Sequence, residues 1–246
     1  MSEEKPVVYL LPGLLCDRTI WRDQVVGLAE QFDVRVPDYR DCDSIGAMAQ
    51  VVLEAAPPQF ALAGHSMGGR VALEIVRQKS QRITRLALLD TAAGPAAAAE
   101  YDKRMAWVRL AEEQGMKALA GVWLPPMLHP DRVHDKLLVG ELEAMIQDFT
   151  PAQFAGQIRA LLRRPDAVPV LGRVSCPALV ICGRQDAWRT VEQHAELASR
   201  IPGAALEVIE DCGHMSTVER PVEVTALLRR FFARDGVPAR AGRERP

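Results

Sequence analysis

Short hydrophobic runs alternate along the chain with longer segments of helical periodicity. Residues 7–11 are apolar throughout, as expected of a strand buried on both faces. Residues 32–36 alternate between hydrophobic and polar positions and end before Pro37, which indicates a less buried strand. Further strands are predicted over 60–63, 86–89, 178–181 and 205–209, and helices over 19–30, 44–56, 68–79, 189–200 and 221–233. This alternation predicts a parallel sheet with helices on both faces.

The interval 91–165 interrupts the alternation. It contains several helical patterns and no convincing strand, and it is too long to be a simple connection. We therefore expect a helical cap or lid inserted into one sheet domain, which consists of residues 1–90 and 166–246. The segment after Ala233 has no apolar pattern, and we expect it to be frayed.

The composition is that of a soluble globular protein. Hydrophobic residues make up 48% and charged residues 25% of the 246 positions, which excludes disordered, fibrous and membrane proteins. The 30 basic and 32 acidic residues give a net charge of −2, so nothing indicates nucleic acid or an anionic membrane as a partner. No apolar stretch reaches the roughly 18 residues that span a bilayer, and no secretory signal is recognised. We expect a cytoplasmic monomer or homodimer that acts on a small-molecule substrate.

The five cysteines are widely spaced and form no C-x-x-C pair. Zinc sites and disulfide frameworks have closer and more regular spacings. We therefore expect reduced thiols, no metal and no organic cofactor.

One glycine-rich motif carries the clearest chemistry. Gly64-His65-Ser66-Met67-Gly68-Gly69 lies directly between a predicted strand and a predicted helix, which is the setting of a G-x-S-x-G nucleophile elbow. Its glycines lack the side chains that would clash where strand and helix approach each other. Ser66 then lies at a helix N-terminus, where the helix dipole favours negative charge. The Met67 N–H would point to the position of an oxyanion, so we predict that Ser66 is a nucleophile.

A serine nucleophile needs a base and a group that orients the base. His214 lies in a loop after the last predicted strand, at the strand end where open α/β sheets place their sites. His194 falls inside a helical pattern, and we expect it at the surface. Asp186 follows the strand 178–181 through a glycine turn and is the favoured acid. Asp90 also follows a strand and is the alternative acid, although we favour a capping role for it.

The loop after the first strand would supply the second oxyanion donor. In Pro12-Gly13-Leu14-Leu15, Gly13 lets the backbone turn so that the Leu14 N–H faces Ser66. Cys16 has no base beside it, and we interpret it as a small apolar loop residue. The expected pocket walls are Leu14, Leu15 and Met67, together with Trp107, Trp123, Met127 and Leu128 from the lid, although each of these lid residues could equally belong to the lid's own core. Such an apolar wall suggests a small to medium, uncharged acyl group.

Four pieces of the chain together resemble the α/β-hydrolase superfamily, and the resemblance covers nearly the whole chain. They are Leu11-Pro12-Gly13-Leu14, Gly64-His65-Ser66-Met67-Gly68-Gly69, Gly183-Arg184-Gln185-Asp186 and Gly213-His214. The resemblance implies a Ser66–Asp186–His214 triad, an oxyanion hole from the N–H groups of Leu14 and Met67, and a helical cap.

The chain departs from the superfamily pattern at two points. It has Pro12-Gly13 where the superfamily usually has His-Gly, and only six residues precede its first strand, where an antiparallel hairpin is usual. We therefore expect an α/β-hydrolase fold of about six strands without that hairpin, with the strand 32–36 at an edge.

Three functions are compatible with these motifs. The first is a serine hydrolase that cleaves a carboxylic ester or lactone of a largely apolar substrate through an acyl-enzyme on Ser66. The second is a carbon–carbon bond hydrolase of the aromatic-degradation type, or a related eliminase, with the same triad. It would need a basic group for a substrate carboxylate, and the candidates are Arg70, Arg104, Arg109, Arg132 and Arg159. The third is a non-enzymatic binding protein of this fold, against which the complete triad argues.

Overall fold

A computed structural model describes residues 4–233 of the chain. Six strands form one sheet in the order β2-β1-β3-β4-β5-β6, and all neighbouring strands are parallel. They are β1 (Val7–Leu11), β2 (Asp33–Arg35), β3 (Phe60–His65), β4 (Ile83–Leu89), β5 (Ala178–Gly183) and β6 (Ala205–Ile209). The predicted six-stranded parallel sheet is confirmed, with β2 at its edge. The segment after Ala233, for which we expect fraying, lies outside the described residues.

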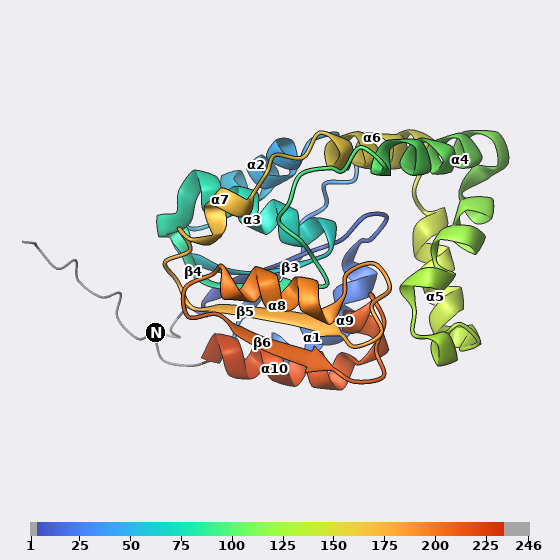
Figure 1. Cartoon of the computed structure of the whole chain (residues 1–246). Helices are drawn as coiled ribbons and strands as arrows, with labels where there is room; N and C mark the ends of the chain where they lie inside the picture. Colours follow the sequence, from blue (N-terminus) through green and yellow to red (C-terminus); the bar gives the residue numbers. More distant parts are fainter. Residues whose placement is uncertain (1–3, 234–246) are drawn as a thin grey trace, which may run out of the picture.

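Helices cover both faces of the sheet (Figure 1). On one face, α1 (Arg22–Leu28) packs against α10 (Pro221–Ala233). On the other face, α2 (Ile45–Ala55) packs against α3 (Met67–Lys79), and α8 (Val191–Ser199) packs against β5 and β6. The remaining helices are α4 (Glu100–Trp123), α5 (Lys136–Gln147), α6 (Pro151–Leu162), α7 (Val168–Leu171) and α9 (Ser216–Glu219). None of the helices within residues 4–233 combines the length and the hydrophobicity needed to cross a bilayer.

The side chains of the central strands explain why the sheet forms. Every residue of β3 and of β5 is buried, as expected for parallel strands covered on both faces. The helix starts follow local chemistry. Ser44 accepts a hydrogen bond from the Ala47 N–H at the start of α2, and Thr150 and Thr190 form capping boxes at the starts of α6 and α8.

The interval 91–165 contains α4, α5 and α6, which we call the inserted helices. Figure 1 shows them beside the end of the sheet toward which the strand arrows point. The helix α4 packs against both α5 and α6, and its backbone bends at Gly115, which has a φ of 82°. Buried residues of the inserted helices and of the sheet form one continuous hydrophobic cluster, so these helices share a core with the rest of the chain.

Candidate active site

Ser66 is the single residue between β3 and α3. Its φ of 53° lies in the left-handed region, which is unfavourable for a residue with a side chain. Two hydrogen bonds hold this backbone: the Ser66 N–H donates to the Leu89 carbonyl (2.8 Å), and the Thr91 hydroxyl donates to the Ser66 carbonyl (2.6 Å). The turn therefore presents the Ser66 side chain at the head of α3.

The glycines of the motif are required by close backbone contacts. A Cβ at Gly64 would lie 2.4 Å from the Gly68 carbonyl oxygen, and a Cβ at Gly68 would lie 2.1 Å from the Leu11 carbonyl oxygen. Neither position can hold a side chain without moving the backbone. The predicted strand–turn–helix setting of Ser66 is therefore present in the structure.

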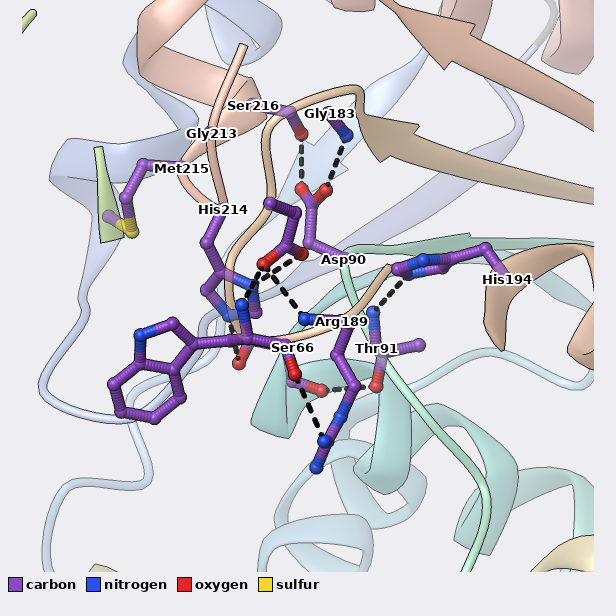
Figure 2. A network of polar contacts seen from close by, with 12 residues as sticks. Ser66, Asp90, Thr91, Gly183, Arg189, His194, Gly213, His214, Met215 and Ser216 are labelled. Carbon is purple, nitrogen blue, oxygen red and sulfur yellow. Dashed lines mark hydrogen bonds and ion pairs between the residues drawn. The ribbon is translucent and has the colours of Figure 1, made fainter. Parts of the chain in front are cut away.

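His214 joins Ser66 to Asp186. Its Nε2 lies 2.9 Å from Ser66 Oγ, and both residues are labelled in Figure 2. Its Nδ1 lies 2.8 Å from Asp186 Oδ2. The other carboxylate oxygen, Asp186 Oδ1, accepts the backbone N–H groups of Trp188 (2.8 Å) and Arg189 (3.0 Å). With the Nδ1–H donated to Asp186, Nε2 is free to accept the hydroxyl proton of Ser66.

His214 and Asp186 shift each other's pKa. Burial alone lowers the pKa of His214, but the charge of Asp186 and its hydrogen bond outweigh burial, so the net shift is upward. Burial alone raises the pKa of Asp186, but the charge and hydrogen bond of His214 and the two backbone N–H groups bring it below its ordinary value. The pair therefore keeps Asp186 ionised and makes His214 a better proton acceptor.

Further hydrogen bonds fix the loop that carries His214. Its N–H donates to the Met127 carbonyl (2.8 Å), and its carbonyl lies 2.8 Å from His65 Nε2. The buried Glu219 carboxylate accepts three backbone N–H groups, those of His129 (2.7 Å), Gly213 (3.0 Å) and Met215 (3.2 Å). Because Met127 and His129 belong to the interval 91–165, the histidine loop and this interval are held together directly.

The expected capping role of Asp90 is wrong. Its Oδ1 accepts the Gly183 N–H (3.1 Å), its Oδ2 accepts the Ser216 hydroxyl, and the side chain is fully buried between these partners (Figure 2). Burial, followed by the charge of Asp186, raises the pKa of Asp90 to about 8. The His214 ring is hydrogen-bonded to Asp186 and not to Asp90, which removes Asp90 as the alternative partner of the base.

The expected surface position of His194 is also wrong. The residue is fully buried, its Nε2 accepts the Thr91 N–H (3.0 Å), and its Nδ1 lies 2.9 Å from the Thr190 carbonyl. Asp90 was expected to cap the segment that follows β4. The Thr91 N–H at the start of that segment instead has His194 Nε2 as its acceptor. His194 lies three and four residues before Leu197 and Ala198, the other buried residues of α8, so helical spacing places all three on the same buried face.

The loop after β1 lies against Ser66. A Cβ at Gly13 would lie 2.9 Å from His65 Nδ1 and 3.3 Å from Ser66 Cβ, so a side chain there would crowd both residues. Leu14 and Met67 both border the space above Ser66. Within residues 4–233 no hydrogen bond from the Leu14 N–H is found, and Met67, as the first residue of α3, has no carbonyl of a preceding turn for its N–H. Both N–H groups are therefore available to a ligand.

Cys16 follows this loop and is not activated. Its thiol is buried and lies 3.2 Å from the Leu14 carbonyl, and burial raises its pKa far above the ordinary value of a thiol. A thiol with a raised pKa is a poor nucleophile, which agrees with the interpretation of Cys16 as an apolar loop residue.

Two adjoining spaces lie above Ser66. The inner cavity, of about 40 Å³, is bordered by Ser66, His214, Leu14, Met67, Met127, Leu161, Trp188, Asp90, Thr91, Ala92, Arg70, Arg104 and Arg189. The outer hollow, of about 470 Å³, shares Arg104, Trp188 and Arg189 with the inner cavity and adds Trp107, Glu100, Lys103, Ala97, Pro126 and Ala187. Both the loops at the end of the sheet and the interval 91–165 thus contribute to the walls.

The structure corrects the expected pocket at three positions. Met127 borders the inner cavity and Trp107 the outer hollow, whereas Leu15, Trp123 and Leu128 are buried outside both linings. The N–H of Leu15 donates to the Gln157 side chain of α6 (2.9 Å), and the Trp123 ring packs edge-on against Trp188 (6.2 Å between centroids). These residues pack behind the residues that line the two spaces.

Two wall residues were not predicted from the sequence. The Trp188 ring lies 5.9 Å from the His214 ring and stacks on Trp107 at 5.6 Å, and Arg189 follows it along the wall. Both come within three residues after Asp186, so the turn that places the acid also places them. Their closeness to Asp186 in the sequence was the signal that could have identified them.

Of the arginines proposed for a carboxylate, Arg70 and Arg104 reach the inner cavity. The expectation of an uncharged wall is therefore wrong.

Comparison with known proteins agrees with this geometry. The sequence profile of the alpha/beta hydrolase family matches residues 8–227. The chain therefore belongs to the alpha/beta hydrolase family, as its motifs predict.

Individual relatives are similar over most of the chain. The 3-oxoadipate enol-lactonase 2 of Acinetobacter baylyi is 26% identical over an alignment that covers 93% of this chain and 90% of the relative. Among solved structures, a thermophilic esterase from Thermogutta terrifontis has a TM-score of 0.85 at 26% identity, over 93% of this chain and 90% of that one. The enol-lactonase from Burkholderia xenovorans LB400 has a TM-score of 0.84 at 26% identity, over 94% and 92% of the two chains.

Proposed function

We propose that the protein is a serine hydrolase that cleaves a carboxylic ester or lactone through an acyl-enzyme on Ser66. The observation that carries this proposal is the continuous hydrogen-bonded path from Ser66 Oγ through His214 to Asp186, with distances of 2.9 and 2.8 Å. The similarity to an enol-lactonase and an esterase over nine-tenths of the chain supports it. In this proposal the interval 91–165 is a lid over the bound substrate, and residues 1–90 and 166–246 form the sheet domain.

The chemistry follows from the geometry of these side chains. Ser66 Oγ attacks the carbonyl carbon while its proton passes to His214 Nε2, and the N–H groups of Leu14 and Met67 stabilise the oxyanion. When the intermediate collapses, the bond to the leaving oxygen breaks and His214 gives the proton to that oxygen. Water then attacks the acyl-enzyme, His214 takes a proton from it, and the acid leaves as the proton returns to Ser66.

The carbon–carbon bond hydrolase stays a second candidate because of one observation. Arginines border the inner cavity together with Ser66, and this alternative requires a basic group for a substrate carboxylate. Its reaction would use the same three residues, so the site geometry does not separate it from ester hydrolysis. The intact path from Ser66 to Asp186 argues against the non-enzymatic alternative.

A labelling experiment with a substrate panel tests the proposed function. We expect a fluorophosphonate probe to label Ser66, located by mass spectrometry of the peptide, and a panel of esters and lactones to be hydrolysed faster than a vinylogous diketone. Faster turnover of the diketone would favour the carbon–carbon bond hydrolase instead. An unlabelled Ser66 together with no turnover of any substrate would refute both and support a binding protein.

The pH dependence of hydrolysis reports on His214. Only the neutral imidazole can accept the Ser66 proton, and the net effect of burial and Asp186 raises the pKa of His214 above the ordinary value of 6.5. We therefore expect kcat/KM for an uncharged ester to rise with pH through a midpoint above 6.5. The ester itself does not titrate, so the midpoint belongs to the free enzyme. A midpoint at or below 6.5 would contradict the coupling of His214 to Asp186.

A further inference from the structure

Three arginines reach the inner cavity from three different elements. Arg70 comes from α3 and Arg104 from α4. Arg189, which Figure 2 labels, comes from the turn after Asp186. Arg70 is four residues after Ser66, one helical turn along α3, and borders the inner cavity together with the serine. Ser66 is therefore surrounded by cationic side chains that neither the triad nor the oxyanion hole uses.

The hydrogen bonds of these arginines leave donors unused. Arg104 donates Nε and Nη2 to Glu100 Oε2 (3.1 and 3.0 Å), while its buried Nη1 has no hydrogen-bond partner in the described part of the chain. Arg70 donates Nη1 to the Gly94 carbonyl (2.8 Å), and Arg189 donates Nη1 to the Trp188 carbonyl (3.0 Å). A buried guanidinium N–H without an acceptor is costly, which suggests that a ligand supplies the acceptor.

The charges around the cavity are not balanced. Glu100 pairs with both Arg104 and Arg164, at 3.0 and 2.6 Å. By contrast, no ion pair within residues 4–233 joins Arg70 or Arg189 to an acidic residue. Asp90 also borders the cavity, but its raised pKa of about 8 leaves it mostly uncharged at neutral pH. Burial and the neighbouring arginines lower the pKa of Arg70, as expected where cations lie close together.

We propose that the substrate carries a carboxylate, which Arg70, Arg104 and Arg189 bind while the ester or lactone carbonyl lies at Ser66. This inference rests on the proposed function and specifies its substrate class. A guanidinium binds a carboxylate through two parallel hydrogen bonds, so a single carboxylate can use the free donors of this cluster and offset its charge. The substrate is thus acidic rather than uncharged, and its remaining part extends into the outer hollow, which Trp107 and Trp188 border.

Binding to an inactive variant tests the inference without hydrolysis. In the Ser66→Ala protein, calorimetry compares the monomethyl esters of succinate, glutarate, adipate and pimelate with the dimethyl esters of the same acids. Each pair differs only in one methyl group and the charge that it removes, and the series varies the distance from the carboxylate to the ester. A second pair, 4-acetoxybutanoate and its methyl ester, places the carboxylate on the alcohol side. We expect at least one charged member to bind tenfold or more tightly than its neutral partner.

Substitutions assign the effect to the cluster. Arg104→Gln should reduce the preference for the charged member by about ten- to a hundredfold, which corresponds to one charged hydrogen-bonded contact. Arg109→Gln is the matched control, because Arg109 is exposed on the same helix and lies outside both linings. If thermal melting shows that Arg104→Gln does not fold, Arg189→Gln tests the same preference for the charged member. Arg189 is only half-buried in its turn. A purely structural role would weaken the charged and neutral members equally, which would overturn the inference.

Turnover by the unmodified enzyme separates this inference from the proposed function. If neutral esters are hydrolysed at Ser66 but no charged member is preferred in binding or in kcat/KM, the carboxylate site is refuted and the proposed function stands. If the charged members bind preferentially but no ester, lactone or diketone is turned over, the proposed function fails and the carboxylate site stands.

Discussion

Replacing Ser66 with alanine will abolish hydrolysis and leave the fold intact. The expected loss in kcat is roughly 10⁵- to 10⁶-fold, as when the nucleophile of an established serine triad is removed. Two neighbouring groups cannot replace the hydroxyl: the thiol of Cys16 is buried with a raised pKa, and the hydroxyl of Ser216 is bonded to Asp90. Alanine keeps the backbone contacts of the turn and loses one hydrogen bond, to His214, so the free energy of unfolding should fall by only about 1 kcal/mol.

Steady-state kinetics with the best ester of the panel, together with thermal melting, measure this result. Ser199→Ala is the matched control, because its exposed hydroxyl bonds only to the Glu196 carbonyl in the described part of the chain. It should keep full activity. Hydrolysis by purified Ser66→Ala at more than about a hundredth of the original rate would show that another group is the nucleophile.

The sequence predicts those parts of the candidate site that are local or that lie at the end of a strand. The elbow is a run of consecutive residues, so its glycines and Ser66 identify the turn without tertiary information. Asp186 and His214 are far from Ser66 in sequence, but both follow strands of a parallel sheet, whose carboxyl ends share one edge. The strand ends were less accurate. The apolar run predicts a strand from 86, whereas β4 begins at Ile83, because Arg85 and Ile83 also pair with β3, on either side of a register shift at Thr84.

The arginine cluster could not be selected from the sequence. The chain has 25 arginines, and nothing in their spacing distinguishes Arg70, Arg104 and Arg189 from the others. They meet because α4 and the turn after Asp186 close over the head of α3, which is a property of the tertiary structure. For the same reason the sequence does not show which apolar residues of the interval 91–165 line the pocket and which belong to the core of the inserted helices. That division depends on the position of Trp188, which contacts both Trp107 and Trp123.

The two buried aspartates near His214 will respond very differently to the same substitution. Asp186→Asn should lower kcat by about 10⁴-fold. Because Asp186 Oδ1 accepts the N–H groups of Trp188 and Arg189, the amide oxygen of asparagine must occupy that position, and its NH₂ group then faces His214 Nδ1. The ring is forced into the tautomer that carries its proton on Nε2, which cannot accept the proton of Ser66.

Asp90→Asn should lower kcat by less than about tenfold at pH 7, because a neutral amide replaces a carboxyl that is mostly protonated there. The amide oxygen can accept the Gly183 N–H, and the NH₂ group can donate to the Ser216 hydroxyl oxygen, so both contacts are kept with the direction of the second reversed. Steady-state kinetics at pH 7 compare the kcat of the two variants directly, and thermal melting shows whether both are folded. Equal losses would mean that Asp90 shares the orientation of His214, whereas a larger loss for Asp90→Asn would reverse the assignment of the acid. The geometry argues against that reversal, since His214 Nδ1 lies 2.8 Å from Asp186.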